Sequence, residues 1–526
     1  MSRPGRDLQL ALAVFAVLFA VGAWHKGFHV DEFYSWIYCR VCSWEDILAM
    51  RDTGIGHPPL FHLLLKSVQT LFPEGPARLM RLINFAVGLL SLTVLWRVLQ
   101  REPHYHPGLL IGFAASAALL DGMMLSRMYG LAFLGACLTV RSGEKFARTP
   151  TLPAFLGLIA TIVFALLADF NNFLLLPYWG MVLLRPLRIF KIALYGSFAT
   201  LAGLWVLLAS GQGERRGKGD LAWSAYAFVR YINRICFEFL NSILSFWFFE
   251  TLIAALLAVV AATWMHYRRQ GHSGSLADRL MLAVIAIAAF QLLAAAGIPF
   301  AAIALLMALV LVWLAGQILR HRPLDLRSVN ARMALSVLGA WMILLTMQTV
   351  FWRTLISPRF LLVLMPFVLL FLQRNLPAPS LNATGAVLLV SGLLYTFSAG
   401  IGEIYPAPPP VSGPVAYQNS AALANSYLLN AHRDPRPPML LDNSYVEKAC
   451  RICVIETRTV PFDTLEAITV IGWEGLASKN LIPPEFELVG SRMSPVSTLD
   501  SWQFSFLHPI RERQFHLLEF RKKIAR

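Results

Sequence analysis

Residues 8–24 read LQLALAVFAVLFAVGAW, a run without a charged side chain. An α-helix needs about 20 mainly apolar residues to cross the hydrocarbon core of a bilayer. Arg3 and Arg6 precede the run, and no small-x-small cleavage site follows it. The pattern therefore favours an uncleaved first membrane helix over a secretory signal peptide.

Twelve further apolar segments continue this pattern along the 526-residue chain. Hydrophobic residues make up 57% of the sequence and charged residues 14%, against roughly 45–50% and 25% in soluble domains. The composition excludes a disordered chain, a coiled coil and a small disulfide scaffold. It predicts a polytopic all-α membrane protein with about thirteen transmembrane helices. The segments lie near 8–24, 80–96, 107–120, 128–140, 153–168, 172–184, 192–210, 247–265, 280–297, 300–319, 333–350, 359–373 and 384–399.

The formal net charge of +15 is concentrated in alternate short connections. Counted from an N-terminus in the cytoplasm, the inner connections hold 18 Lys and Arg residues against 5 acidic residues. This is the positive-inside pattern, so the excess sets topology and does not indicate a nucleic-acid partner. We expect a multi-pass protein of the bacterial inner (cytoplasmic) membrane, with membrane lipids as neighbours, a cytoplasmic N-terminus and an extracytoplasmic C-terminal region.

The chain divides into a transmembrane domain, 1–399, and a soluble domain, 400–526. The first has two long outer loops, 25–79 with short interfacial helices and 211–246 with a Gly-rich start. A proline-rich linker opens the second, and β-like runs follow, among them 468–471. We expect a small extracytoplasmic α/β or α+β domain there.

Two pairs of cysteines have C-x-x-C spacing, one in each outer region. They are Cys39 with Cys42, and Cys450 with Cys453. Outside the cytosol this spacing favours structural disulfides, within each pair or between the two regions. A single four-cysteine zinc site is the alternative.

Carboxylates beside a membrane helix are expensive and often functional. Asp31 and Glu32 follow the first apolar run. One of the two carboxylates could accept a proton from an acceptor hydroxyl. Alternatively, the pair could stabilise a helix N-terminus. His57 precedes Pro58 and Pro59, so it stands at a helix start, as an anion ligand or as a cap.

Three arginines lie at the outer ends of apolar segments and a fourth, Arg353, sits close to one of them, Arg359. Each could contact lipid headgroups, or several could converge on a phosphate. Further polar residues at this boundary are candidates for lining a cavity, and Asp169 and Asn171 could instead bind a metal or simply end helices. The arginines are Arg81, Arg127, Arg353 and Arg359, and the cavity candidates are Tyr34, Tyr129, Asp169 and Asn171.

Five segments in this order resemble the GT-C superfamily of membrane glycosyltransferases, in the branch of protein O-mannosyltransferases and the lipid A aminoarabinose transferase. The matching segments are Asp31-Glu32-Phe33-Tyr34, Gly56-His57-Pro58-Pro59-Leu60-Phe61, Arg81-Leu82 with Gly88, Ser126-Arg127-Met128-Tyr129, and Pro358-Arg359-Phe360-Leu361-Leu362 with Pro366. Ile83 departs from the family's usual proline, and Asp169-Phe170-Asn171-Asn172 stands where relatives often have His or Lys.

The resemblance implies a GT-C-like fold and an inverting transfer of a sugar from a polyprenyl-phosphate donor on the outer face. The acceptor is a hydroxyl of a lipid, glycan or protein. Asp31 would be the general base, with Glu32 in reserve. His57 and the four arginines would bind the donor phosphate, without a metal or other cofactor.

Other classes of protein fit the composition. An oligosaccharide ligase would move a whole glycan from a lipid diphosphate. A transporter or flippase of polyprenyl-linked substrates, or an anchoring protein for an envelope complex, would need many spans too. A transporter also predicts internal symmetry and ionisable residues at mid-membrane, and the sequence offers little of either.

Overall fold

The computed structural model of the chain describes the following residues: 5–25, 30–49, 58–73, 77–102, 105–184, most of 329–340, 362–397 and, in the C-terminal region, 413–417, 439–441, 460–472, 481–493 and 516–523. The predicted spans at 192–210, 247–265, 280–297 and 300–319 lie outside these residues, as does the loop 211–246.

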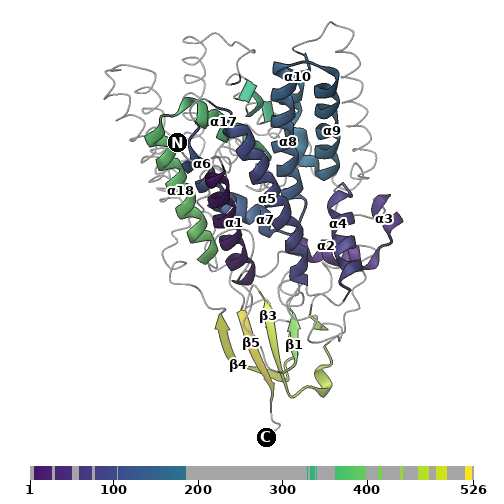
Figure 1. Cartoon of the computed structure of the whole chain (residues 1–526). Helices are drawn as coiled ribbons and strands as arrows, with labels where there is room; N and C mark the ends of the chain where they lie inside the picture. The colour runs from purple at the N-terminus through teal and green to yellow at the C-terminus, as the bar shows by residue number, and fades with distance from the viewer. Residues whose placement is uncertain are drawn as a thin grey trace, which may run out of the picture. The chain divides into compact units, whose positions relative to one another are not determined.

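The described part of residues 1–399 is helical, as the apolar runs predict (Figure 1). Three short helices occupy the loop 25–79, also as expected. The helices are α1 (Arg6–His25), α2 (Val30–Val41), α3 (Trp44–Leu48), α4 (Leu60–Leu71), α5 (Met80–Leu99), α6 (Pro107–Ala115), α7 (Ala117–Met124), α8 (Tyr129–Arg148), α9 (Leu152–Ala168), α10 (Leu176–Leu184), α17 (Met365–Asn375) and α18 (Ala378–Phe397), with 3-10 turns η1 (Ala77–Leu79) and η2 (Phe170–Leu175).

Three of the described helices are long and apolar enough to cross a membrane: Arg6–Ala23 within α1, then α5 and α18. Helices α6 and α7 make a fourth span if they are counted together, with a bend of 43° between them. These apolar helices indicate a membrane protein. The number of thirteen spans and the orientation stay predictions.

The predicted span at 107–120 is broken at Ser116, which has an extended backbone with φ −63° and ψ 146°. A break exposes backbone groups that lipid cannot satisfy. The hydroxyl of Ser391 in α18 accepts a hydrogen bond from the N–H of Ala117. The broken helix is therefore compensated by a neighbouring side chain.

The chain forms two compact units, each described here by itself. The first unit comprises residues 1–16, 87–122 and 129–393, and the second comprises 17–86, 123–128 and 394–526. In the first unit α8 packs on α9 and contacts α10 and α17, and the ribbon shows α8, α9 and α10 side by side (Figure 1).

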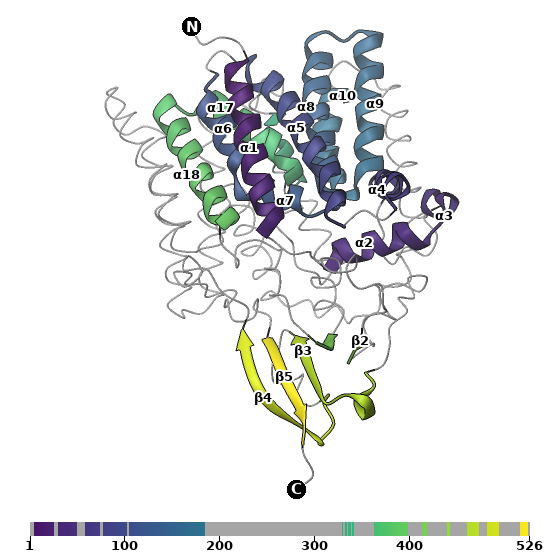
Figure 2. The ribbon, with the colours of Figure 1, turned by 60° about the horizontal axis from the view of Figure 1, so that its bottom comes forward.

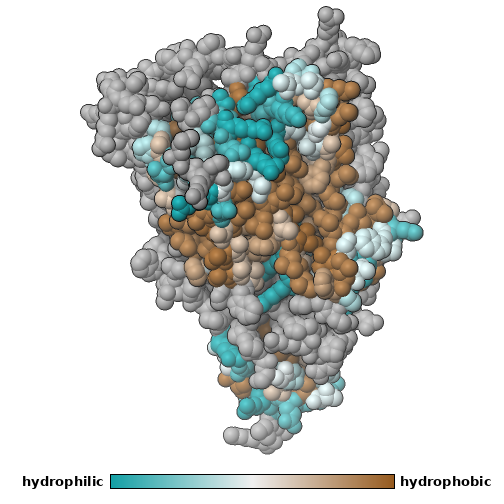
Figure 3. All heavy atoms as spheres, viewed as in Figure 1, coloured by the Kyte–Doolittle hydropathy of each residue, from teal (hydrophilic) through white to brown (hydrophobic). Residues whose placement is uncertain are grey.

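Polar and apolar side chains of the first unit are distributed as a membrane bundle requires. Ser91, Thr139 and Ser391 are buried, whereas Leu90 and Leu156 are more than half exposed. Hydrophobic side chains cover α5 and α9 in the view of Figure 3, beside a hydrophilic patch where α5 ends. Apolar exposure of this kind suits contact with lipid.

A mixed five-stranded sheet belongs to the second unit (Figure 2). Its order is β2-β1-β3-β5-β4, parallel between β1 and its two neighbours and antiparallel elsewhere. The strands are β1 (Val415–Tyr417), β2 (Met439–Leu440), β3 (Ala467–Gly472), β4 (Phe486–Met493) and β5 (His516–Lys522), and a 3-10 turn, η4 (Phe462–Thr464), precedes β3.

The sheet confirms the predicted strand at 468–471. Ile468, Val470, Leu518 and Phe520 form its hydrophobic core together with Phe486. Strand β3 is buried over nearly its whole length, which is typical of a central strand covered on both faces. The predicted strand at 454–457 lies outside the described residues.

Candidate functional site

Helix α2 buries one face, which carries the polar residues Glu32 and Ser35. Glu32, Ser35, Trp36 and Cys39 are all buried, and their spacing of three and four residues places them on one side of a helix. Arg40 lies in the last turn, where a cation complements the helix dipole.

Helix α4 holds this face of α2 in place. The Nε2 atom of Gln69 donates to the backbone oxygen of Trp36 at 2.9 Å, and the thiol of Cys39 donates to the backbone oxygen of His62 at 3.3 Å. The rings of Tyr38 and His62 meet edge to face with centroids 5.3 Å apart. The position of Glu32 is thus fixed by packing and by hydrogen bonds.

The carboxylate of Glu32 joins three separate segments of the chain. Its Oε1 atom lies 3.7 Å from Nε of Arg81, at the start of α5, and accepts the backbone N–H of Ser126 at 3.0 Å. The Glu32 side chain has no exposed surface, and Arg81 is 2% exposed. A buried charge is stable only when it is paired and hydrogen-bonded, and this one has both kinds of partner.

Arg81 and Asn84 occupy successive turns of α5 and bind backbone carbonyls on either side. Nη1 of Arg81 donates to the oxygen of Ala23 at 3.0 Å, near the end of α1. Nδ2 of Asn84 donates to the oxygens of Leu125 and Arg127 at 2.7 and 2.9 Å. Helix α5 thereby fixes the turn between α7 and α8.

Two hydroxyls close to Glu32 in the chain or in its contacts are buried without a hydrogen-bond partner among the described residues. They are Ser35 Oγ and Ser126 Oγ. Ser35 is three residues from Glu32 on the same face of α2, and the N–H of Ser126 binds the Glu32 carboxylate. Unsatisfied buried polar groups are uncommon, and each calls for a partner such as a bound water, an ion or a polar ligand. We call Glu32, Ser35, Arg81, Asn84 and Ser126 the Glu32 cluster.

The structure brings part of the predicted site together. Glu32 and Arg81 are in direct contact, and Arg127, which is buried, belongs to the turn that Asn84 holds. Asp31 and Tyr34 lie on α2, but their side chains are outside the described residues, as are His57, Arg353, Arg359, Cys450 and Cys453.

The remaining predicted residues belong to the first unit. Tyr129 begins α8 and is buried. Asp169 is buried between α9 and η2, and Nδ2 of Asn171 donates to its Oδ2 at 2.7 Å. This contact lies within one turn, where Asp169 ends α9 and precedes η2.

Cys39 and Cys42 are both buried on α2. Burial raises the pKa of the Cys39 thiol, the charge of Lys66 acts in the opposite direction, and the thiol donates to His62. Among the described residues, no group of three or more His, Cys, Asp and Glu side chains could hold a metal ion. The disulfide and zinc interpretations involving Cys450 and Cys453 stay predictions.

Sequence reasoning missed Asn84 and Ser35. Both lie in segments whose neighbours are apolar or aromatic, so each reads as a minor interruption of a helix. Asn84 follows Arg81 by three residues, and this spacing on one helix face was the available signal.

Comparison with known proteins gives no relative. No protein-family model matches the chain, and no significant match is found among curated proteins or solved structures.

Proposed function

We propose that the chain is an inverting membrane glycosyltransferase, which moves a sugar from a polyprenyl phosphate to an acceptor hydroxyl at the outer face of the bacterial inner membrane. One observation carries the proposal. Glu32 contacts Arg81 and Ser126, and these residues come from three of the five segments that resemble the GT-C pattern. Residues up to 94 positions apart are thus joined in one cluster.

The contacts of Glu32 favour a division of roles between the two neighbouring carboxylates. The Glu32 carboxylate is buried, and its Oε1 atom is already engaged by Arg81 and by the N–H of Ser126, so it is not free to contact an acceptor hydroxyl. We therefore assign the base to Asp31 and make Glu32 a positioning residue, which holds α2 against α5 together with Arg81.

In the proposed reaction Asp31 accepts the proton of the acceptor hydroxyl as the hydroxyl oxygen attacks the anomeric carbon. The bond from that carbon to the phosphate oxygen breaks, and the lipid phosphate leaves with the electron pair. A single displacement inverts the configuration. Arg127, His57, Arg353 and Arg359 are the proposed ligands of the phosphate, whose developing charge they would stabilise.

The test compares a gene deletion with complementation by wild type, Asp31→Asn, Glu32→Gln and Glu45→Gln. Glu45 is an exposed carboxylate on α3 and serves as the matched control. Mass spectrometry of polyprenyl-phosphate sugars and envelope glycans is the readout. We expect the deletion and Asp31→Asn to accumulate a lipid-linked sugar and to lack one sugar residue on an acceptor. Complementation with Glu45→Gln removes the accumulation and restores the missing sugar residue.

With purified protein, Asp31→Asn lowers turnover by about 10²–10⁴-fold, the usual contribution of a general base. Near-normal turnover removes Asp31 from that role. A deletion that leaves every lipid-linked sugar unchanged overturns the proposal. Loss of a whole oligosaccharide assigns a ligase instead, and a donor that accumulates on one membrane face without loss of any linkage assigns a flippase.

A further inference from the structure

A basic pocket lies in the first unit, where α5 and α8 both end. It is small, with a cavity volume of about 30 Å³, and Arg101, Arg141, Lys145 and Arg148 line it, together with Glu102 and Glu144. The pocket belongs to neither the Glu32 cluster nor the proposed transfer of a sugar.

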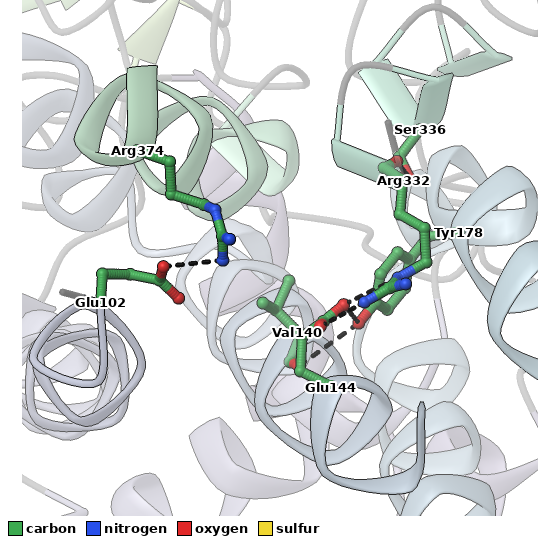
Figure 4. A network of polar contacts seen from close by, with 7 residues as sticks. All are labelled: Glu102, Val140, Glu144, Tyr178, Arg332, Ser336 and Arg374. Carbon is green, nitrogen blue, oxygen red and sulfur yellow. Dashed lines mark hydrogen bonds and ion pairs between the residues drawn. The ribbon is translucent and has the colours of Figure 1, made fainter. Parts of the chain in front are cut away.

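Both carboxylates of the pocket are held by arginines from later parts of the chain (Figure 4). Glu102 Oε2 lies 2.7 Å from Nη1 of Arg374. The carboxylate of Glu144 accepts hydrogen bonds from Nη2 and Nε of Arg332 at 2.6 and 3.1 Å. It also accepts one from the hydroxyl of Tyr178 at 3.1 Å. Their negative charge is therefore balanced by cations outside the lining of the pocket.

Four positive charges line the pocket, and that of Arg148 also acts on nearby Glu102. Within the described residues, none of them forms an ion pair with a carboxylate. Burial lowers the pKa of Arg141, and the positive charges of Arg97 and Arg101 lower it further. Cations gathered this closely repel one another, and a bound anion relieves that repulsion.

The place of the pocket along the chain indicates the source of the anion. Helix α5 is a candidate membrane span by length and composition and ends at Leu99, so in a bilayer Arg101 would lie close to the headgroups. Val98 and Leu370 form an apolar part of the wall. A phospholipid offers a phosphate and an apolar chain together, whereas free phosphate offers only the charge.

We propose that this basic pocket binds the phosphate of an anionic phospholipid. Each cation near a membrane surface contributes enough attraction for about a fivefold change in affinity. The site fixes a lipid against the ends of α5 and α8, where Glu102 and Glu144 tie those helices to Arg374 and Arg332.

The experiment uses the full-length protein purified in detergent and measures lipid binding by native mass spectrometry. The probes are phosphatidylglycerol, cardiolipin, phosphatidylcholine and inorganic phosphate. Variants Arg141→Gln and Lys145→Gln remove one cation each, Lys145→Arg retains the charge, and Arg40→Gln removes an exposed cation of the second unit as the control.

We expect the anionic lipids to bind at least tenfold more tightly than phosphatidylcholine, and we expect their affinity to fall as the salt concentration rises. Arg141→Gln and Lys145→Gln each lower the affinity for anionic lipids about fivefold, whereas Lys145→Arg and Arg40→Gln leave it unchanged. Equal binding of phosphatidylcholine overturns the proposal, as does unchanged binding in both Gln variants. Inorganic phosphate that binds as tightly as the lipids assigns the pocket to a soluble anion. The wild-type comparison decides the question even if a variant fails to fold.

Discussion

The Nε atom of Arg81 lies 3.7 Å from Oε1 of Glu32, and both side chains are buried. This separation is longer than a hydrogen bond, so the contact is mainly electrostatic. The same oxygen accepts the N–H of Ser126, while Arg81 donates to Ala23. Glu32 therefore connects α2, α5 and the turn before α8 through one carboxylate.

Replacing Glu32 by Ala should strongly destabilise the protein. Arg81 then stays buried without its carboxylate, and breaking such a pair from one side costs about 3–5 kcal/mol. Thermal or denaturant unfolding of the purified protein in detergent measures the loss. Glu45→Ala on exposed α3 should change stability by no more than about 0.5 kcal/mol. A Glu32→Ala protein as stable as wild type would falsify the assigned ion pair.

Asn84 should be needed for the turn between α7 and α8. Asn84→Ala leaves the buried carbonyls of Leu125 and Arg127 without this donor, and each unsatisfied group costs about 1–3 kcal/mol. Thr93→Val is the control on the same helix, because the Thr93 hydroxyl donates only to Leu89 in the preceding turn. Hydrogen exchange of residues 125–127 should increase in Asn84→Ala alone, and unchanged exchange contradicts the assignment.

Close contact between α18 and α6 makes Gly392 sensitive to substitution. A Cβ atom at this position overlaps the backbone oxygen of Ala115, so the two helices must separate. Gly392→Ala should cost about 1–3 kcal/mol. Gly157→Ala on α9 meets no atom within 4 Å and should stabilise the protein by about 0.5–1 kcal/mol. The two melting temperatures, measured together, must move in opposite directions.

Hydropathy predicts where the helices lie but not how they bend. The apolar run 80–96 matches α5, because a span needs little beyond length and apolar side chains. The break at Ser116 depends on Ser391 and on the approach of Gly392 to Ala115, contacts between residues some 270 positions apart. No local pattern carries that information.

The same distinction applies to the candidate site. Asp31-Glu32 and Arg81 stand out as charges beside apolar runs, so the sequence identifies them. Asn84 does not stand out, because its partners are backbone carbonyls of residues 125 and 127, which leave no side-chain signature. The pairing of Glu144 with Arg332 was hidden for a similar reason, since both residues read as ordinary members of inner connections.

Glu102 should make stability depend on pH, since burial raises its pKa above the ordinary value of about 4.5 although Arg374 lowers it. The folded protein therefore keeps this proton to a higher pH than the unfolded chain. The free energy of unfolding must fall as the pH rises from about 4.5 through the raised pKa, and this contribution is constant above it.

Glu102→Gln removes this titration, so the wild type should gain stability relative to the variant as the pH falls from 7 towards 4.5. Arg374→Gln removes the charge that lowers the pKa of Glu102, and the decline should then extend to higher pH. Melting temperatures of the three proteins between pH 4 and 8 measure both effects. Parallel curves for wild type and Glu102→Gln would mean that Glu102 ionises alike in the folded and unfolded states, contrary to the burial of its carboxylate beside Arg374.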